Sequence, residues 1–180
     1  MYRRFLLTSG HRTIAERALL FSLLFAAGCN YGFHGGGFPS HIRTLYIEPV
    51  QNETSNFELE QELSAALLQR LPGALGVTPA ARDNADAILQ VKIVGYDDQA
   101  QSYATGGATS PPRILERQVQ VTLQVRIIDL TRDPPVVLWS ARSLLGRGQY
   151  ADDSQTDQVG RERAIEHLLQ QIVDGAQSQW

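Results

Sequence analysis

The sequence of 180 residues contains a single cysteine, so it cannot form an intramolecular disulfide and its fold must depend on a hydrophobic core. The sequence has four histidines, His11, His34, His41 and His167. None of them has metal-ligand spacing with the cysteine, with an acidic residue or with another histidine. No Gly-X-Ser-X-Gly or similar nucleophile motif occurs. The sequence therefore predicts a protein that is not an enzyme and that uses no metal or other cofactor.

Positive charge and long apolar runs are scarce after the cysteine. Twelve of the 16 basic residues and 18 of the 19 acidic residues follow Cys29, so this part of the chain carries a net charge of −6. A negative overall field argues against a nucleic acid as partner. No apolar run after Cys29 approaches the roughly 20 residues that a helix needs to cross a bilayer.

A short apolar run does precede Cys29. Residues 18–28 carry no charge, are too few to span a membrane, and follow an arginine-rich start, which is typical of an export signal. The end of the run, Phe25-Ala26-Ala27-Gly28-Cys29, resembles the bacterial lipobox. That resemblance implies that residues 1–28 are a lipoprotein signal peptide and that Cys29 becomes the first residue, with a diacylglyceryl group on its sulfur and an acyl chain on its amine. The alternative is an ordinary secretory signal followed by a buried free thiol.

The mature chain is expected to stay at a membrane. Two or three acyl chains, at about 0.8 kcal/mol for each buried methylene, anchor a soluble domain stably. Asn30 is not the aspartate that tends to retain enteric lipoproteins in the inner membrane, which favours the outer membrane. Residues 29–40 are glycine-rich and are interpreted as a flexible, lipidated tether. Residues 41–180 are the right length for one domain.

The hydrophobic pattern of this domain predicts two helices and four strands. Apolar residues recur at helical spacing over 57–71, where Leu71-Pro72-Gly73 is expected to end the helix, and again over 156–173. Strands are predicted over 41–50, 88–96, 119–127 and 136–145, with a polar loop over 97–112. The order β-α-β-β-β-α predicts an α+β fold with both helices on one face of a four-stranded, largely antiparallel sheet.

The early part of the mature chain resembles one family. A lipobox cysteine is followed by Tyr31-Gly32-Phe33, a glycine run, the strand His41–Val50, Asn52-Glu53-Thr54 and the helix Leu59–Leu67. In this order, the segments are similar to those of the lipopolysaccharide-assembly lipoproteins of the LptE family. The resemblance implies a non-enzymatic partner of the outer-membrane β-barrel LptD, lodged in its lumen, that assists lipopolysaccharide transport to the outer leaflet. The alternatives are a lipoprotein activator of penicillin-binding proteins and a subunit of a secretion pore.

A lipopolysaccharide ligand would require basic side chains at a local patch, because the domain is acidic as a whole. If the strands pair about turns near residues 105 and 133, Lys92, Arg113, Arg117 and Arg147 gather at one end of the sheet, with Arg117 opposite Gln149. Arg126 and Arg142 would lie together near the middle, on the face away from the core. We predict that the first four contact lipid A phosphates, for which the planar guanidinium is suited. The alternative is that they are ordinary solvated surface cations.

Overall fold

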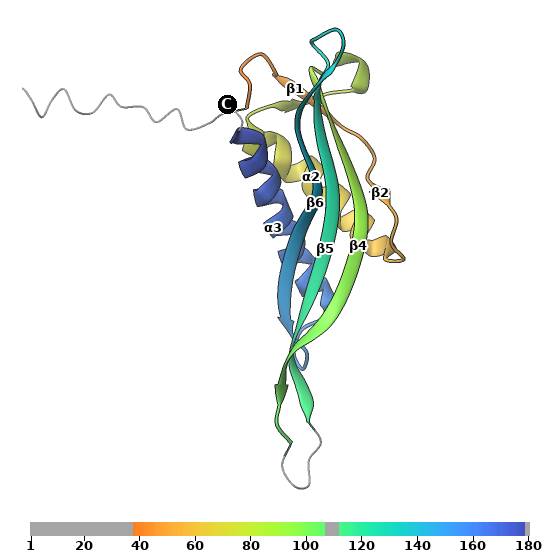
Figure 1. The fold of residues 1–180 in the computed structure, drawn as a ribbon, viewed down its shortest axis with the longest axis vertical. Coiled ribbons are helices and arrows are strands. Elements are labelled where there is room, and N and C mark those ends of the chain that lie inside the picture. Colours follow the sequence, from red (N-terminus) through yellow and green to blue (C-terminus); the bar gives the residue numbers. More distant parts are fainter. Residues whose placement is uncertain (1–37, 107–111, 179–180) are drawn as a thin grey trace, which may run out of the picture. The chain divides into compact units, whose positions relative to one another are not determined.

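A computed structural model describes residues 38–106 and 112–178 (Figure 1). The predicted signal peptide, Cys29 and most of the tether lie outside the described residues, as does the middle of the loop predicted over 97–112. The elements follow in the order β1 (Thr44–Ile47), β2 (Gln51–Asn52), α2 (Phe57–Leu75), β3 (Thr78–Pro79), the short 3₁₀ helix η2 (Arg82–Asn84), β4 (Ala87–Ala104), β5 (Arg113–Asp129), β6 (Val136–Ala151) and α3 (Asp157–Gln177).

The strands form one mixed sheet in the order β3-β1-β4-β5-β6, and β2 also pairs with β4. The long strands β4, β5 and β6 are antiparallel, whereas β1 runs parallel to both β3 and β4. The predicted α+β class and helix arrangement are confirmed. The sheet differs from the prediction by the two-residue strands β2 and β3, which are too short to leave a hydrophobic period in the sequence.

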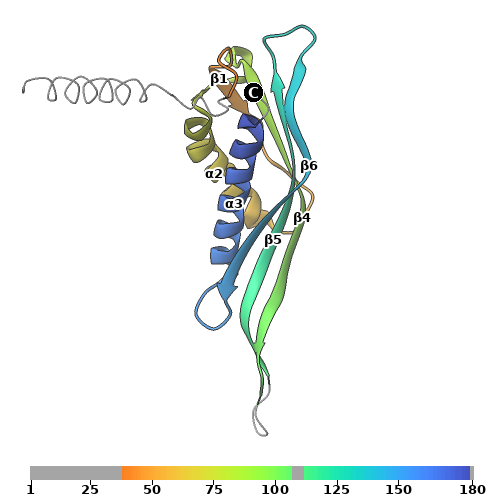
Figure 2. The same ribbon diagram turned by 60° about the vertical axis from the view of Figure 1, so that its left-hand side comes forward.

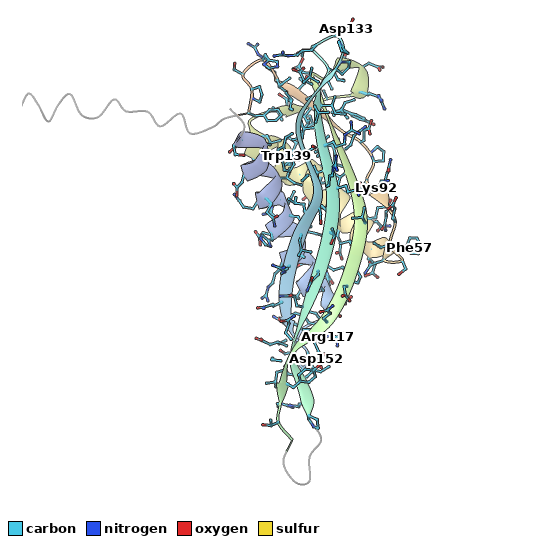
Figure 3. The ribbon with its side chains drawn as sticks, in the orientation of Figure 1. Phe57, Lys92, Arg117, Asp133, Trp139 and Asp152 are labelled. Carbon is cyan, nitrogen blue, oxygen red and sulfur yellow. The ribbon has the colours of Figure 1, made fainter. Side chains whose placement is uncertain are left out.

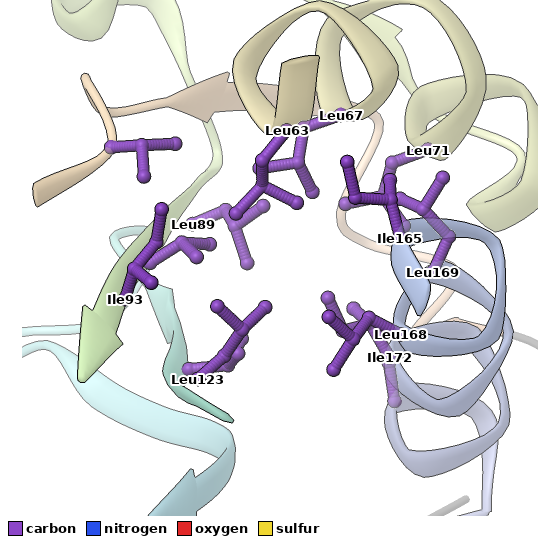
Figure 4. Packing of buried hydrophobic residues seen from close by; sticks show 14 of the residues in the cluster. Leu63, Leu67, Leu71, Leu89, Ile93, Leu123, Ile165, Leu168, Leu169 and Ile172 are labelled. Atoms are coloured by element: carbon purple, nitrogen blue, oxygen red, sulfur yellow. The ribbon is translucent and has the colours of Figure 1, made fainter. Parts of the chain in front are cut away.

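Both helices pack on one face of the sheet and leave the other face uncovered (Figure 2). Alternate residues of β5 from Val119 to Ile127 are fully buried under the helices, as the alternation in the sequence predicts. Helix α2 contributes a leucine stripe at helical spacing, and α3 adds Leu168 and Ile172 (Figure 4). Each such side chain contributes about 1.5–3 kcal/mol through its burial, so this core accounts for the relative position of helices and sheet.

Helix α2 is longer than predicted, because it continues through Pro72 to Leu75. A proline inside a helix removes one backbone hydrogen bond and costs about 3 kcal/mol. Pro72 and Leu75 are both buried, and their burial offsets that cost. The helix ends at Gly76, whose φ of 73° lies in the left-handed region that glycine adopts without strain.

The prediction of a loop over 97–112 is wrong for residues 97–104. Strand β4 runs on to Ala104 and β5 begins at Arg113, so the two strands form a long hairpin that projects past the helices (Figure 1). In this part of the hairpin neither face is covered by the helices, and most of its side chains are polar. Hydrophobic alternation is the signal from which strands are predicted, and a hairpin held mainly by its backbone ladder does not require it.

Among the helices that the structure describes, none combines the length and the apolar character that a membrane crossing needs.

Candidate functional site

The uncovered face of the sheet is the candidate functional site, because no helix covers it (Figure 2) and its paired rows are mostly polar. Residues directly opposite each other on β4, β5 and β6 lie on the same face. On this face the directly paired rows are Gln99–Gln118–Gln149, Asp97–Gln120–Arg147 and Gln90–Arg126–Ser140. Glutamine is thus the commonest residue of these rows, and the surface can both donate and accept hydrogen bonds without a large net charge.

The glutamines near the hairpin bond to each other. Gln118 is the most buried of them, and its Oε1 accepts from Nε2 of Gln120 at 3.1 Å and from Nε2 of Gln101 at 3.4 Å. The amide of Gln99 donates to the carboxylate of Asp97. The bond from Gln101 joins β4 to β5, and the other two join residues two apart on one strand. Together they order the polar side chains on a sheet face that has no apolar cover.

Two adjoining hollows lie on the same face, around the row Gln90–Arg126–Ser140. The first has a volume of about 290 Å³ and is lined by Glu48, Lys92 and Arg126 among others. The second, of about 390 Å³, is lined by Arg126, Ser140 and Arg142 among others. Arg126 and Gln124 belong to both hollows, so the two form a continuous depression across β4, β5 and β6.

Arg126 and Arg142 were predicted to lie together near the middle of this face, and the second hollow confirms that placement. Both side chains are exposed. Across residues 38–106 and 112–178, no carboxylate lies within ion-pair distance of either guanidinium. This depression therefore holds two positive charges that have no internal counterion.

The four residues predicted to gather at one end of the sheet do not do so. Lys92 is opposite Gln124 in the middle of the sheet, and its Nζ pairs with Glu53 at 2.9 Å (Figure 3). Arg113 is exposed next to the end of the hairpin, opposite Ala104. The predicted register of Lys92 is wrong because Ala104 pairs with Arg113, whereas a turn near residue 105 would put Asp97 opposite Arg113. The bulges in the β4–β5 pairing change that register by only one residue.

Arg117 and Arg147 lie on opposite faces of the sheet. Arg117 is opposite Tyr150, one residue away from the predicted Gln149, and it shares the helix-side face with Val119. Arg147 is opposite Gln120 on the uncovered face. The irregularity between Leu123 and Val125 accounts for the wrong register, because an extra residue in one strand displaces all later pairs by one.

Arg117 belongs to an internal polar group rather than to a free basic patch. Its Nε donates to both carboxylate oxygens of Asp98, at 3.1 and 3.2 Å, which raises the pKa of Arg117. The hydroxyl of Tyr150 donates to the same carboxylate at 2.7 Å. Burial and the adjacent Asp98 raise the pKa of Tyr150 to about 12. The group stabilises the base of the hairpin where it extends beyond α3 (Figure 3).

Arg161 forms a buried ion cluster that the sequence reading missed. Its side chain is only 4% exposed, yet it donates to carboxylates of Glu58 at 2.8 Å, of Glu62 at 2.9 and 3.0 Å, and of Asp157. The bond to Glu62 raises the pKa of Arg161, so the guanidinium is always charged. Arginine 161 falls on the apolar stripe of the predicted helix 156–173, and a charge at such a position is the signal that indicates a buried ion pair.

Metal binding has no support in the described part of the chain, where no three histidine, cysteine, aspartate or glutamate side chains are placed to hold an ion. The side chains of the paired rows on the uncovered face are mostly amides and charged groups, which offer hydrogen bonding and charge pairing.

Comparison with known protein families gave a match to one family model. The family model described as "LptE: Lipopolysaccharide-assembly" matches residues 42–176. A search of curated proteins gave no match.

Several solved structures are similar to this chain. The hypothetical protein CT253 from Chlamydia trachomatis has a TM-score of 0.52 at 9% identity, with 75% of this chain and 98% of that chain covered. The lipoprotein GNA1162 from Neisseria meningitidis has a TM-score of 0.45 at 14% identity, with 73% and 99% covered. The rare lipoprotein B from Shewanella oneidensis has a TM-score of 0.36 at 15% identity, with 73% and 95% covered. At these identities the likeness concerns the fold alone.

Proposed function

Because this chain belongs to the LptE family of lipopolysaccharide-assembly proteins, we propose that it is an outer-membrane lipoprotein that partners an LptD-type β-barrel and helps lipopolysaccharide reach the outer leaflet. The family match over residues 42–176 is the observation that carries this proposal, since it covers the sheet and both helices.

The two faces of the sheet suit such a role. One face is buried under α2 and α3, whereas the other presents ordered glutamine amides and few apolar groups. The interior of an outer-membrane barrel is polar. A sheet whose exposed face offers many donors and acceptors can contact a polar barrel wall without a large desolvation cost, because its amides can exchange water for protein partners.

Anchoring is assigned to Cys29. The predicted tether of about a dozen residues spans only about 20 Å as a flexible chain, which would hold the domain close to the membrane. Acylation at Cys29 would then bring the domain to the inner leaflet of the outer membrane, where the barrel is inserted.

Lipopolysaccharide is proposed to contact basic residues of the domain. Arg147 is the strongest candidate, because it lies on the uncovered face and pairs with no carboxylate of the described residues. Lys92 lies on the same face, but a phosphate would have to compete with Glu53 for its ammonium. Arg113 is exposed beside the end of the hairpin. Arg117 is the weakest of the four, because a phosphate would have to compete with Asp98 for its guanidinium.

Co-purification tests the partnership. The full-length lipoprotein is isolated in detergent from native outer membranes, and we expect an LptD-type barrel in near-equal amount. In the Cys29→Ser variant we expect the protein to leave the membrane fraction and the barrel to be lost from the pull-down. A penicillin-binding protein in place of the barrel would identify the chain as an activator, and a ring of this chain alone would identify a pore subunit; either result would overturn the proposal.

Lipopolysaccharide contact is tested separately with the double variant Lys92→Ala/Arg147→Ala. We expect weaker binding to immobilised lipopolysaccharide, by about tenfold if each cation makes one charge-assisted bond. The control is Arg70→Ala, which removes an exposed cation on the helix layer. Equal binding by both variants would remove Lys92 and Arg147 from the ligand site.

A further inference from the structure

Strand β6 is an edge of the sheet, so one row of its backbone N–H and C=O groups points away from β5. Such a row is a template for pairing with another chain unless it is covered. The second half of the strand is covered and the first half is not.

Over residues 145–151 the outward backbone groups are bonded to side chains that follow the strand. Three side chains from α3 and one from the connecting loop make these bonds. Gln171 donates to the Leu145 carbonyl at 3.0 Å, the Arg147 N–H donates to Nδ1 of His167 at 3.4 Å, Arg163 donates to the Gln149 carbonyl, and the Ala151 N–H donates to Oε1 of Gln155 at 3.0 Å.

The spacing of these bonds has a geometric basis. Arg163, His167 and Gln171 are four residues apart along α3, a rise of about 6 Å per step. The strand residues that they contact are two apart, a rise of about 6.8 Å per step. Because the helix runs antiparallel to β6, the two periods stay nearly in step over three contacts, and one helix face covers the edge.

Glycines let α3 approach β6 closely enough for these bonds. A Cβ at Gly148 would lie 2.0 Å from the carbonyl oxygen of Gly160, and a Cβ at Gly146 would lie 2.5 Å from that of Ala164. A strand with side chains at positions 146 and 148 would hold the helix away from the edge. The covered half of β6 thus depends on sequence features in both elements.

The first half of β6, residues 136–143, has no such cover. Among the residues that the structure describes, no side chain bonds to an outward backbone group of this segment. The start of β6 lies past the C-terminal end of α3, where the β5–β6 hairpin extends beyond the helices (Figure 2). Val136 and Val137 are 43% and 45% exposed there. An uncovered apolar edge is unfavourable in a free protein and favourable as a docking strand.

The chemistry beside the free edge indicates what can occupy it. The 390 Å³ hollow adjoins this segment on the uncovered face, and it holds the guanidinium groups of Arg126 and Arg142. A strand added to β6 would direct every second side chain toward that face. A carboxylate on such a side chain would neutralise two arginines that have no carboxylate partner within the described chain.

We propose that residues 136–143 of β6 pair with an extended strand of a partner protein that carries an acidic side chain directed at Arg126 and Arg142. A paired length of eight residues is about 27 Å, which is ample for β-augmentation. A second copy of this chain fits less well, because its own segment 136–143 contains Arg142 and no acidic residue. This inference goes beyond the proposed function, since any protein that offers such a strand would serve, the barrel included.

Site-specific cross-linking in native cells tests the proposal. The photo-reactive amino acid p-benzoylphenylalanine replaces Ser140 in the full-length lipoprotein and, as the matched control, replaces Gln149 at the covered half of the same strand. Both positions are exposed. We expect products from position 140 that map by mass spectrometry to one contiguous segment of a partner with an acidic residue, and no product from position 149 that maps to that segment.

Charge reversal completes the test. Arg142→Glu should lower the yield from position 140 by about tenfold, whereas Arg70→Glu, at an exposed cation on the helix layer, should leave it within about twofold. Replacing the mapped acidic residue by arginine should restore the yield with Arg142→Glu. Products from positions 140 and 149 that map to the same segment, cross-links to lipopolysaccharide, or cross-links between two copies of this chain would each overturn the proposal.

The outcomes also separate this proposal from the proposed function. If the barrel co-purifies but position 140 cross-links to no protein, the edge proposal is wrong and the partnership stands. If position 140 maps to an acidic strand of another protein and the barrel is absent, the partnership is wrong and the edge proposal stands.

Hydrogen exchange of the protein alone checks the premise. The amides of Arg147 and Ala151 should exchange at least about tenfold more slowly than the outward amides of residues 136–143. Equal rates in both halves would mean that the side chains of α3 do not cover the edge.

Discussion

Removing the guanidinium of Arg161 should destabilise the fold more than removing any exposed arginine. Arg161→Met keeps most of the apolar stem and leaves Glu58, Glu62 and Asp157 around a site with no cation. Breaking a buried ion pair by deleting one partner costs about 3–5 kcal/mol. We expect the lower end of that range, about 3 kcal/mol, because the carboxylates are partly exposed: 76%, 25% and 47% of their side-chain surface remains accessible.

A second ion pair between the same two helices supplies the control. Arg70 of α2 pairs with Glu166 of α3 at 3.1 Å, and both side chains are more than half exposed. Arg70→Met should therefore cost at most about 1 kcal/mol. Both substitutions exchange the same residue types across the same helix–helix contact, so the difference between them isolates the effect of burial.

Urea unfolding of the two variants, followed by circular dichroism, measures the prediction. A loss of about 3 kcal/mol corresponds to a fall in Tm of about 10 °C for a domain of this size. If Arg161→Met loses no more stability than Arg70→Met, the ion cluster does not stabilise the contact between α2 and α3, and the energetic reasoning from burial is wrong.

Three further predictions concern positions outside this cluster. Gly148→Ala should lower the free energy of unfolding in urea by at least about 1–3 kcal/mol, because its Cβ would lie 2.0 Å from a backbone carbonyl oxygen of α3. As the control, Gly73→Ala in α2, where nothing lies within 4 Å of the new Cβ, should be neutral or stabilising by up to about 1 kcal/mol. The N–H groups of Arg43 and Thr44 lower the pKa of Asp86, so the stability that this carboxylate contributes is present above its ordinary pKa of 3.8 and is lost as pH falls through the lower folded pKa. Asp86→Asn should therefore be less stable than the native chain at pH 7, and the difference in unfolding free energy should shrink in acid. A difference that stays constant with pH would contradict the reasoning. With its pKa raised to about 12, Tyr150 should stay protonated in the folded state after ordinary tyrosines have ionised near pH 10, and the stability it contributes should fall as pH rises from 10 to 12. In an ultraviolet titration, the native chain should show one phenol that ionises late, and Tyr150→Phe should lack it.

Much of the fold could be predicted from the sequence, because burial on one face leaves a period. The alternation of Val119, Val121 and Leu123 predicted a strand with one buried face, and the structure confirms it. The stripes of the two long helices were equally clear. Beyond Asp97 the hairpin contacts water on both faces, so its side chains had no reason to alternate and the sequence was mistaken for a loop.

The placement of charges could be predicted only in part. Arg126 and Arg142 were correctly expected near each other, because they lie close to the β5–β6 turn, where few irregularities of the pairing can displace the register. Arg117 and Arg147 lie farther from the turn, beyond both irregularities of the pairing. A shift of one residue moves a side chain to the other face, and it separated two arginines that a simple ladder would have placed on one patch.

The sequence by itself determined the two-helix, one-sheet architecture, the predicted export and lipidation signal at Cys29, and the absence of any motif for catalysis. Only the tertiary structure decided which arginines have partners, which half of β6 is covered, and where the unpaired charges lie. The reason is physical: hydrophobic periodicity is a local property that survives small displacements, whereas a hydrogen bond or ion pair depends on register and helix distance to within a residue or an ångström.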